Sequence, residues 1–174
     1  MSNPHVLLLT GSPGVGKTTL IRKIAVALST QRLGGFYTEE IRRHGQRQGF
    51  RLVTFAGREA VIAHLDFSHA ERVSKYGVDV AAIDTVVEEA LAVEKSIDIY
   101  LVDEIGKMEC LSGRFVAAMQ VLLDAEKPVV ATIAQKGGGF ISEVKQRRDS
   151  ELWKLTRTNR DSLPEKALTW LGKA

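Results

Sequence analysis

The sequence predicts an α/β fold in which helices cover both faces of a mainly parallel β-sheet. Val6–Thr10 and Ile97–Val102 are short runs of almost continuous apolar residues, which is typical of parallel strands buried on both sides. Lys17–Ser29 instead carries its apolar residues at helical spacing. Because segments of these two kinds alternate along the chain, they indicate a three-layer α/β/α architecture.

The length and composition fit one globular domain over residues 1–174. Of these residues, 44% are apolar and 26% are charged, which excludes a disordered or fibrous chain. The single cysteine, Cys110, cannot form an internal disulfide, and this favours a reducing compartment. The apolar runs are too short to span a bilayer, and Met1–His5 lacks the basic segment of a signal peptide. We therefore expect a cytoplasmic protein that does not enter the membrane.

The first half of the chain is expected to widen the sheet with antiparallel strands. After the first strand and helix, three short segments have strand character, and their connections are short enough for hairpins. These segments are Gly35–Arg42, Phe50–Phe55 and Ala60–Leu65. They predict an antiparallel β extension at about residues 35–65.

The second half returns to alternating helices and strands. The apolar periodicity predicts helices over Val80–Lys95, from Ser112 to Leu123 and over Ile141–Arg148, and strands over Ile97–Val102, Pro128–Ile133 and Leu152–Thr156. Ser162–Glu165 matches a capping box, in which the serine hydroxyl and the glutamate carboxylate satisfy the free amides of a helix start. A last helix is therefore expected from this point.

Gly11–Thr18 carries the strongest chemical signal, because it matches the pattern G-x-x-x-x-G-K-[ST]. It lies between the first buried strand and the first amphipathic helix, which is the context that a phosphate-binding loop requires. Glycines let successive backbone N–H groups turn toward the phosphates. Lys17 would neutralise the β- and γ-phosphate oxygens, and the Thr18 hydroxyl would ligate Mg²⁺. The alternative is a glycine turn with an incidental lysine. The motif predicts a P-loop NTPase domain.

Asp103 and Glu104 end a hydrophobic strand and supply the second half of this site. Such a strand delivers a carboxylate to the edge of the sheet where ligands bind. Asp103 would hold the Mg²⁺ coordination shell, and Glu104 would polarise the attacking water. P-loop proteins with this acid pair usually insert a strand between the Walker A and Walker B strands, and Val129–Ile133 fits that place. Thr132, near its end, would sense the γ-phosphate or orient the water, unless it is an ordinary strand residue.

Several segments together resemble the small nucleoside-triphosphatases of the cancer-related NTPase and thermophile-phosphatase group. The resemblance rests on Gly35–Arg42, Gly49-Phe50, Tyr76–Val78, Asp103–Glu109, Thr156, Asn159 and Arg160. It covers nearly the whole chain and implies Mg²⁺-dependent hydrolysis of ATP, GTP and other triphosphates with weak base selectivity. The nucleotide-binding residues that it and the phosphate loop imply are Gly11, Ser12, Pro13, Gly14, Val15, Gly16, Lys17, Thr18, Thr19, Tyr100, Leu101, Val102, Asp103, Glu104, Ile105, Gly106 and Lys107.

Five further residues have two interpretations each. Lys107 follows a glycine after the acid pair and would reach a phosphate, or it is a surface lysine. Arg148, or Arg147 next to it, would act as an arginine finger from the same chain, or both are solvated. Asn159 and Arg160 would contact the base or the α-phosphate, or they cap and cover a chain end.

Two other functions compete with triphosphate hydrolysis. A small nucleotide or nucleoside kinase needs a domain that binds the phosphate acceptor, and the short strands at about residues 35–65 look too small for one. A nucleic-acid-binding ATPase would use basic and aromatic side chains of the same region. Its candidate contacts are Arg42, Arg43, Arg47, Arg51, Arg58, Phe50 and Phe55. The net charge of +3 comes from scattered residues, so nucleic acid is the less favoured partner. The sequence leaves the oligomeric state open.

Overall fold

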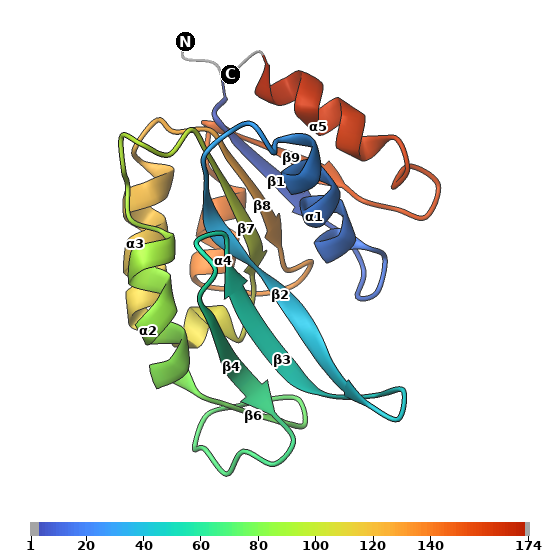
Figure 1. Cartoon of the computed structure of the whole chain (residues 1–174), viewed down its shortest axis with the longest axis vertical. Coiled ribbons are helices and arrows are strands. Elements are labelled where there is room, and N and C mark those ends of the chain that lie inside the picture. The colour runs from blue at the N-terminus through green and yellow to red at the C-terminus, as the bar shows by residue number, and fades with distance from the viewer. Residues whose placement is uncertain (1–3, 173–174) are drawn as a thin grey trace.

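The computed structural model describes residues 4–172, which form a nine-stranded sheet with helices on both faces (Figure 1). The spatial order of the strands is β5-β6-β4-β3-β2-β7-β8-β1-β9. Their bounds are β1 (Val6–Thr10), β2 (Leu33–Arg43), β3 (Gln46–Thr54), β4 (Glu59–His64), β5 (Arg72–Val73), β6 (Tyr76–Val78), β7 (Ile99–Ile105), β8 (Val129–Ile133) and β9 (Ser150–Lys154).

The helices lie in two layers, one on each face of the sheet (Figure 1). α1 and α5 pack on one face, and α2, α3 and α4 pack on the other. Their bounds, with the 3-10 helix η1, are α1 (Lys17–Ala27), α2 (Val80–Ala90), η1 (Glu109–Leu111), α3 (Gly113–Leu123), α4 (Phe140–Lys145) and α5 (Leu163–Leu171). No helix within residues 4–172 is long and apolar enough to cross a bilayer.

The central strands are buried on both faces, as their apolar runs predict. In β1, Leu7 and Leu9 contact the layer of α1 and α5, while Val6 and Leu8 contact the opposite layer. β1 pairs in parallel with β8 and with β9. β8 also pairs in parallel with β7, so it separates the strand before the phosphate loop from the strand of the acid pair. The predicted insertion of Val129–Ile133 between these strands is therefore confirmed.

The antiparallel extension is larger than the sequence predicts. β2 pairs in parallel with β7 and antiparallel with β3, so one strand belongs to both parts of the sheet. β4, β6 and β5 continue the antiparallel order to the edge. The short strands Arg72–Val73 and Tyr76–Val78 were not predicted, because segments of two and three residues are too short to show a periodicity of two.

Helix ends differ from the predicted bounds. Ser112 caps α3 as expected, since its Oγ accepts a hydrogen bond from the Phe115 N–H at 2.9 Å. The capping box at Ser162 is wrong: the Ser162 hydroxyl donates to Asn159 O at 3.0 Å, which leaves no side-chain cap on α5. α2 ends at Ala90 rather than at Lys95.

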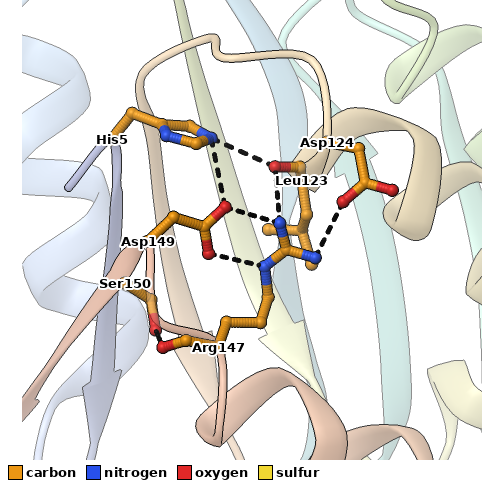
Figure 2. Close-up of polar contacts among 6 residues, drawn as sticks. All are labelled: His5, Leu123, Asp124, Arg147, Asp149 and Ser150. Carbon is orange, nitrogen blue, oxygen red and sulfur yellow. Dashed lines mark hydrogen bonds and ion pairs between the residues drawn. The ribbon is translucent and has the colours of Figure 1, made fainter. Parts of the chain in front are cut away.

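A cluster of polar side chains joins the amino ends of β1 and β9 to the end of α3 (Figure 2). The Arg147 guanidinium donates hydrogen bonds to Asp149 at 2.6 and 2.9 Å, to Asp124 at 2.9 Å and to Leu123 O at 3.0 Å. These hydrogen bonds from Arg147 hold the pKa of Asp149 below its usual value. His5 Nε2 lies 3.1 Å from Leu123 O and 3.8 Å from Asp149 Oδ2. The cluster ties together the amino ends of β1 and β9, whereas the phosphate loop follows the carboxyl end of β1.

Candidate active site

The phosphate loop connects the carboxyl end of β1 to the start of α1. Gly14 and Gly16 have φ angles of 76° and 112°, in the left-handed region that only glycine adopts without strain. Gly16 is the N-cap of α1, so the first amides of the helix have no partner within the helix. Free amides and the positive end of the helix dipole together favour a bound phosphate.

Lys17, the first residue of α1, links the loop to the acid pair. Its Nζ donates a 3.0 Å hydrogen bond to Gly11 O at the start of the loop. The same Nζ lies 3.7 Å from Glu104 Oε2 at the end of β7. The cation that the motif assigns to the phosphates is thus within reach of the carboxylate that the sequence assigns to water activation.

Asp103 is held by hydroxyl groups from three different segments. Thr18 of α1 donates to Oδ2 at 2.6 Å, and Thr132 of β8 donates to Oδ1 at 2.7 Å. Thr38 of β2 donates to Oδ2 from both its N–H, at 3.3 Å, and its hydroxyl, at 3.1 Å. With 1% of its surface exposed, Asp103 relies on these donors to offset the cost of burying its charge. The carboxylate is therefore fixed relative to the phosphate loop.

Two further carboxyl groups lie beside Asp103. Burial raises the pKa of Glu104, and the Asp103 charge adds to this rise while Lys17 opposes it. Burial also raises the pKa of Glu109 to about 8, and the charges of Glu104 and Asp103 add to that rise. A carboxylate with a raised pKa is a stronger base, so Glu104 suits proton abstraction better than an exposed glutamate would.

These groups line a cavity of about 800 Å³. Glu39 and Glu40 of β2 line the same cavity. Glu39 pairs with Arg51 at 2.6 Å and with Arg22 at 3.7 Å. The predicted binding residues that line this cavity are Pro13, Gly14, Gly16, Lys17, Thr18, Thr19, Asp103, Glu104 and Lys107.

The apolar residues of β7 are not among the residues that line the cavity, so their assignment to nucleotide binding stays a prediction. Tyr100, Leu101, Val102 and Ile105 each have 0% exposure and pack in the core. The Tyr100 hydroxyl donates to Ala92 O at 2.6 Å, in the segment between α2 and β7. These residues hold the strand that presents the acid pair.

Arg148 lies too far from the phosphate loop to act as an arginine finger, so this expectation is corrected. It comes two residues before β9, which runs parallel to β1 with Ser150 opposite Val6. The phosphate loop starts after Thr10, at the other end of these strands, and five extended residues span roughly 16 Å. Arg148 is exposed.

Asn159 and Arg160 lie in different surroundings although they are adjacent. The Asn159 side chain closes the loop after β9, because it accepts from the Thr156 N–H and donates to Lys154 O, both at 2.8 Å. Arg160 lines a second cavity of about 220 Å³ together with Gly16 and Thr19. Only Arg160 is therefore placed next to the phosphate loop.

Two residues at the site were not predicted from the sequence. Thr38 becomes visible as a candidate only when β2 is placed beside β7, where Phe36 pairs with Val102. Glu109 is the third acid in the segment that starts at Asp103, and this clustering of acids was the signal available.

The donor set fits a divalent cation shared with a bound phosphate. Within residues 4–172, no group of three or more His, Cys, Asp or Glu side chains could hold a metal ion. Mg²⁺ commonly binds through one or two protein ligands and completes its shell with phosphate oxygens and water. The Thr18 hydroxyl and the Asp103 carboxylate, 2.6 Å apart, form such a partial site.

Known proteins with similar sequences are nucleoside-triphosphatases, in line with a phosphate-binding site. A family model described as NTPase matches residues 6–168. The chain is 41% identical over 167 residues to the nucleoside-triphosphatase THEP1 of Thermotoga sp. strain RQ2, covering 95% of this chain and 94% of that protein. It is 39% identical over 165 residues to the nucleoside-triphosphatase THEP1 of Natranaerobius thermophilus, covering 92% of each chain.

Two solved structures are similar over almost their full length. The crystal structure of THEP1 from the hyperthermophile Aquifex aeolicus superposes with a TM-score of 0.86 at 34% identity, covering 95% of this chain and 98% of that one. The solution structure of a human cancer-related nucleoside triphosphatase superposes with a TM-score of 0.83 at 31% identity, covering 98% of both chains.

Proposed function

We propose that this chain, which belongs to the NTPase family and hydrolyses nucleoside triphosphates, uses Glu104 as the general base when water attacks the γ-phosphate. The products of that step are a nucleoside diphosphate and phosphate. The observation that carries the proposal is the 3.7 Å approach of Lys17 Nζ to Glu104 Oε2 at the mouth of the phosphate loop. A water molecule next to Glu104 is thereby adjacent to the group that Lys17 binds.

Each residue has a distinct part in this step. The amides of the phosphate loop and Lys17 bind the β- and γ-phosphate oxygens, where negative charge builds up during the transfer. Glu104 accepts a proton from water as the new oxygen–phosphorus bond forms and the bridging bond breaks. Thr132 orients Asp103 rather than the water, because its hydroxyl already donates to Asp103 at 2.7 Å.

We further propose Mg²⁺ as the cation, held by Thr18 with Asp103 behind it. When bound, Mg²⁺ supplies charge neutralisation to the phosphate oxygens. Thr18 can donate its proton to Asp103 and keep its oxygen lone pairs for the cation. Asp103 accepts hydrogen bonds on both oxygens, so its main effect is to orient the Thr18 hydroxyl.

ATP, GTP and other triphosphates are the proposed substrates, with weak selection among bases. The cavity next to Thr19 is small. Three charged side chains line it: Lys23 of α1, and Arg160 and Asp161 of the loop after β9. Since a lone cysteine fits a reducing compartment, we place the enzyme in the cytoplasm.

Nucleic acid is not favoured as a partner. Four of the five candidate arginines already pair with carboxylates: Arg42 and Arg47 with Glu40, Arg51 with Glu39, and Arg58 with Glu89. Paired arginines contribute less to the attraction of a phosphate backbone than free ones do.

A panel of triphosphates tests the proposal against its alternatives. Each triphosphate is incubated with Mg²⁺, with and without nucleosides, nucleoside monophosphates or single-stranded RNA. We expect free phosphate from all of them, within roughly 100-fold of one another, and no effect of the additions. Phosphate transferred to a nucleoside would identify a kinase, and release that depends on RNA would identify a nucleic-acid-dependent ATPase.

A further inference from the structure

Two cavities adjoin the phosphate loop, and Gly16 and Thr19 line both of them. The first, of about 800 Å³, contains Lys17 and Glu104, which the proposed reaction places at the γ-phosphate. The second has a volume of about 220 Å³. The nucleoside end of a triphosphate whose γ-phosphate is at Lys17 therefore extends past Gly16 and Thr19 toward the second cavity.

The second cavity combines apolar and charged side chains. Val15 and Leu20 are 5% and 2% exposed and line it together with Lys23, Arg160 and Asp161. These three charged residues are exposed, and within residues 4–172 none of their side chains takes part in an ion pair or a hydrogen bond. Apolar side chains can contact the face of a planar nucleobase, while unpaired charged groups are free to bind its polar edge.

The segment that carries Asp161 is held next to the phosphate loop by its backbone. At its start, the Leu155 N–H donates a 2.7 Å hydrogen bond to the oxygen of Thr10, the last residue before the loop. At its end, the Leu163 N–H donates to Asn159 O at 3.1 Å, and the Leu163 side chain is 5% exposed. The position of Asp161 relative to the phosphate loop is therefore fixed on both sides.

The charged groups of this cavity differ in what they can bind. A carboxylate only accepts hydrogen bonds, whereas an ammonium or a guanidinium only donates them. Guanine presents two adjacent donors, N1–H and the N2 amino group, beside one acceptor, O6. Adenine and cytosine place an acceptor nitrogen next to their amino group, and uracil has a single donor between two acceptors. Guanine is therefore the common nucleobase that offers two adjacent donors to a carboxylate and an acceptor to a cation.

We propose that Asp161 is a specificity-determining residue that selects guanine in the second cavity by accepting hydrogen bonds from N1–H and the N2 amino group. Lys23 and Arg160 are the donors available to O6. This inference rests on the proposed binding of triphosphates at the phosphate loop. Because Asp161 is exposed, water competes for its oxygens, so the preference is about threefold to tenfold and lies within the weak selectivity of the proposed function.

Nucleoside diphosphates test the selection, because they lack the γ-phosphate that is hydrolysed. Binding of GDP, IDP, ADP and XDP is measured by calorimetry with Mg²⁺. Inosine lacks the N2 amino group of guanine, and xanthine carries an acceptor oxygen in its place. We expect the wild type to bind GDP about threefold more tightly than IDP, and up to about tenfold more tightly than ADP or XDP. Equal affinities for GDP, IDP and ADP would overturn the proposal.

Asp161→Asn exchanges one acceptor oxygen for an amide donor. The variant should lose the preference for GDP over IDP, because its NH₂ group cannot accept from the N2 amino group. It should also bind XDP about threefold or more tighter than the wild type does, since the amide can donate to O2 of xanthine. Glu143→Gln removes an exposed carboxylate of α4 and should keep the wild-type order. An unchanged order in Asp161→Asn, or an equal loss for all four diphosphates, would show that Asp161 does not select the nucleobase.

The outcomes separate this inference from the proposed function. Phosphate release by Glu104→Gln tests the general base, whereas diphosphate affinities do not depend on how water is activated. If Glu104→Gln releases phosphate from GTP at the wild-type rate, the proposed function fails. The order of the diphosphate affinities in the wild type and in Asp161→Asn still decides whether Asp161 selects guanine.

Discussion

Lys17 Nζ lies 3.7 Å from Glu104 Oε2, although the two residues are 87 positions apart in the chain. Lys17 begins the helix after β1, and Glu104 belongs to β7. β8 lies between β1 and β7 in the sheet, and the phosphate loop and the acid pair both follow the carboxyl ends of their strands. The topology of the sheet, rather than any local contact, thus brings the phosphate-binding cation and the general base to one place.

The phosphate-binding role of Lys17 predicts a loss of triphosphate affinity in Lys17→Ala. The β- and γ-oxygens would lose a charge-assisted contact inside a partly buried loop. We expect the dissociation constant to rise at least about tenfold, which corresponds to about 1.4 kcal/mol. Binding is measured by calorimetry, with Lys166→Ala, at an exposed position of α5, as the control. Equal affinities in the two variants would show that the loop does not bind the phosphates.

The three threonines around Asp103 predict that the cation requirement depends on them. Thr38→Val and Thr132→Val each remove a hydroxyl that orients Asp103 and should raise the Mg²⁺ concentration needed for half-maximal nucleotide binding. Loss of a hydrogen bond to a buried charge also lowers the free energy of unfolding by about 1.5–3 kcal/mol. Thr85→Val, on the exposed side of α2, is the control. An unchanged Mg²⁺ titration would mean that Asp103 does not act at the cation site.

The position of Arg148 at the far edge of the sheet predicts that it has no part in turnover. Arg148→Ala should release phosphate at the wild-type rate. Arg147→Ala should instead unfold more easily, because Asp149 and Asp124 lose their partner in the cluster of Figure 2. Rates and urea unfolding curves are compared for both variants. A loss of turnover in Arg148→Ala without loss of stability would revive the arginine-finger hypothesis.

The raised pKa of Glu109 predicts a pH-dependent difference in stability. An unfolded glutamate ionises near pH 4.5, whereas folded Glu109 keeps its proton up to about pH 8. Between these values the native state binds more protons than the unfolded state, so wild-type stability falls as the pH rises. Glu109→Gln lacks this titration, so its free energy of unfolding relative to the wild type should rise from pH 5 to pH 8, by a few kcal/mol at most, on the order of 1.4 kcal/mol per pH unit.

Urea unfolding at pH 5, 6.5 and 8 checks this difference, with Glu143→Gln as the control. Both variants lose one carboxyl group, but Glu143 is exposed on α4. A constant difference between Glu109→Gln and the wild type over this range would contradict a protonated Glu109.

The parts of the fold with a strong local signal could be predicted from the sequence. The apolar run of β1, the glycines of the loop and the spacing of α1 all lie within the first 27 residues and need no distant contact. The place of β8 was also predictable, because P-loop proteins with a glutamate directly after the Walker B aspartate usually insert a strand between the Walker A and Walker B strands. The predicted features match the structure, because the local propensity of these segments and the topology of the sheet favour the same arrangement.

The rest of the site depends on contacts between distant segments. Thr38 reaches Asp103 only because β2 runs parallel to β7, and nothing in the local sequence of β2 indicates that pairing. Tyr100 was assigned to the nucleotide by the family resemblance, and its side chain is buried in the core with its hydroxyl on Ala92 O. The place of Arg148 likewise depends on a distant pairing, since β9 runs parallel to β1 with Ser150 opposite Val6.

The most direct test of the account is a single-turnover comparison of Glu104→Gln with the wild type. Glutamine keeps the size and hydrogen-bonding capacity of the side chain but cannot accept the proton of water. We predict that Glu104→Gln binds Mg²⁺-ATP with nearly wild-type affinity, while phosphate release falls by roughly 10²–10⁴-fold, the usual contribution of a general base. A Glu104→Gln protein that releases phosphate at the wild-type rate would contradict the assignment of Glu104 as the base.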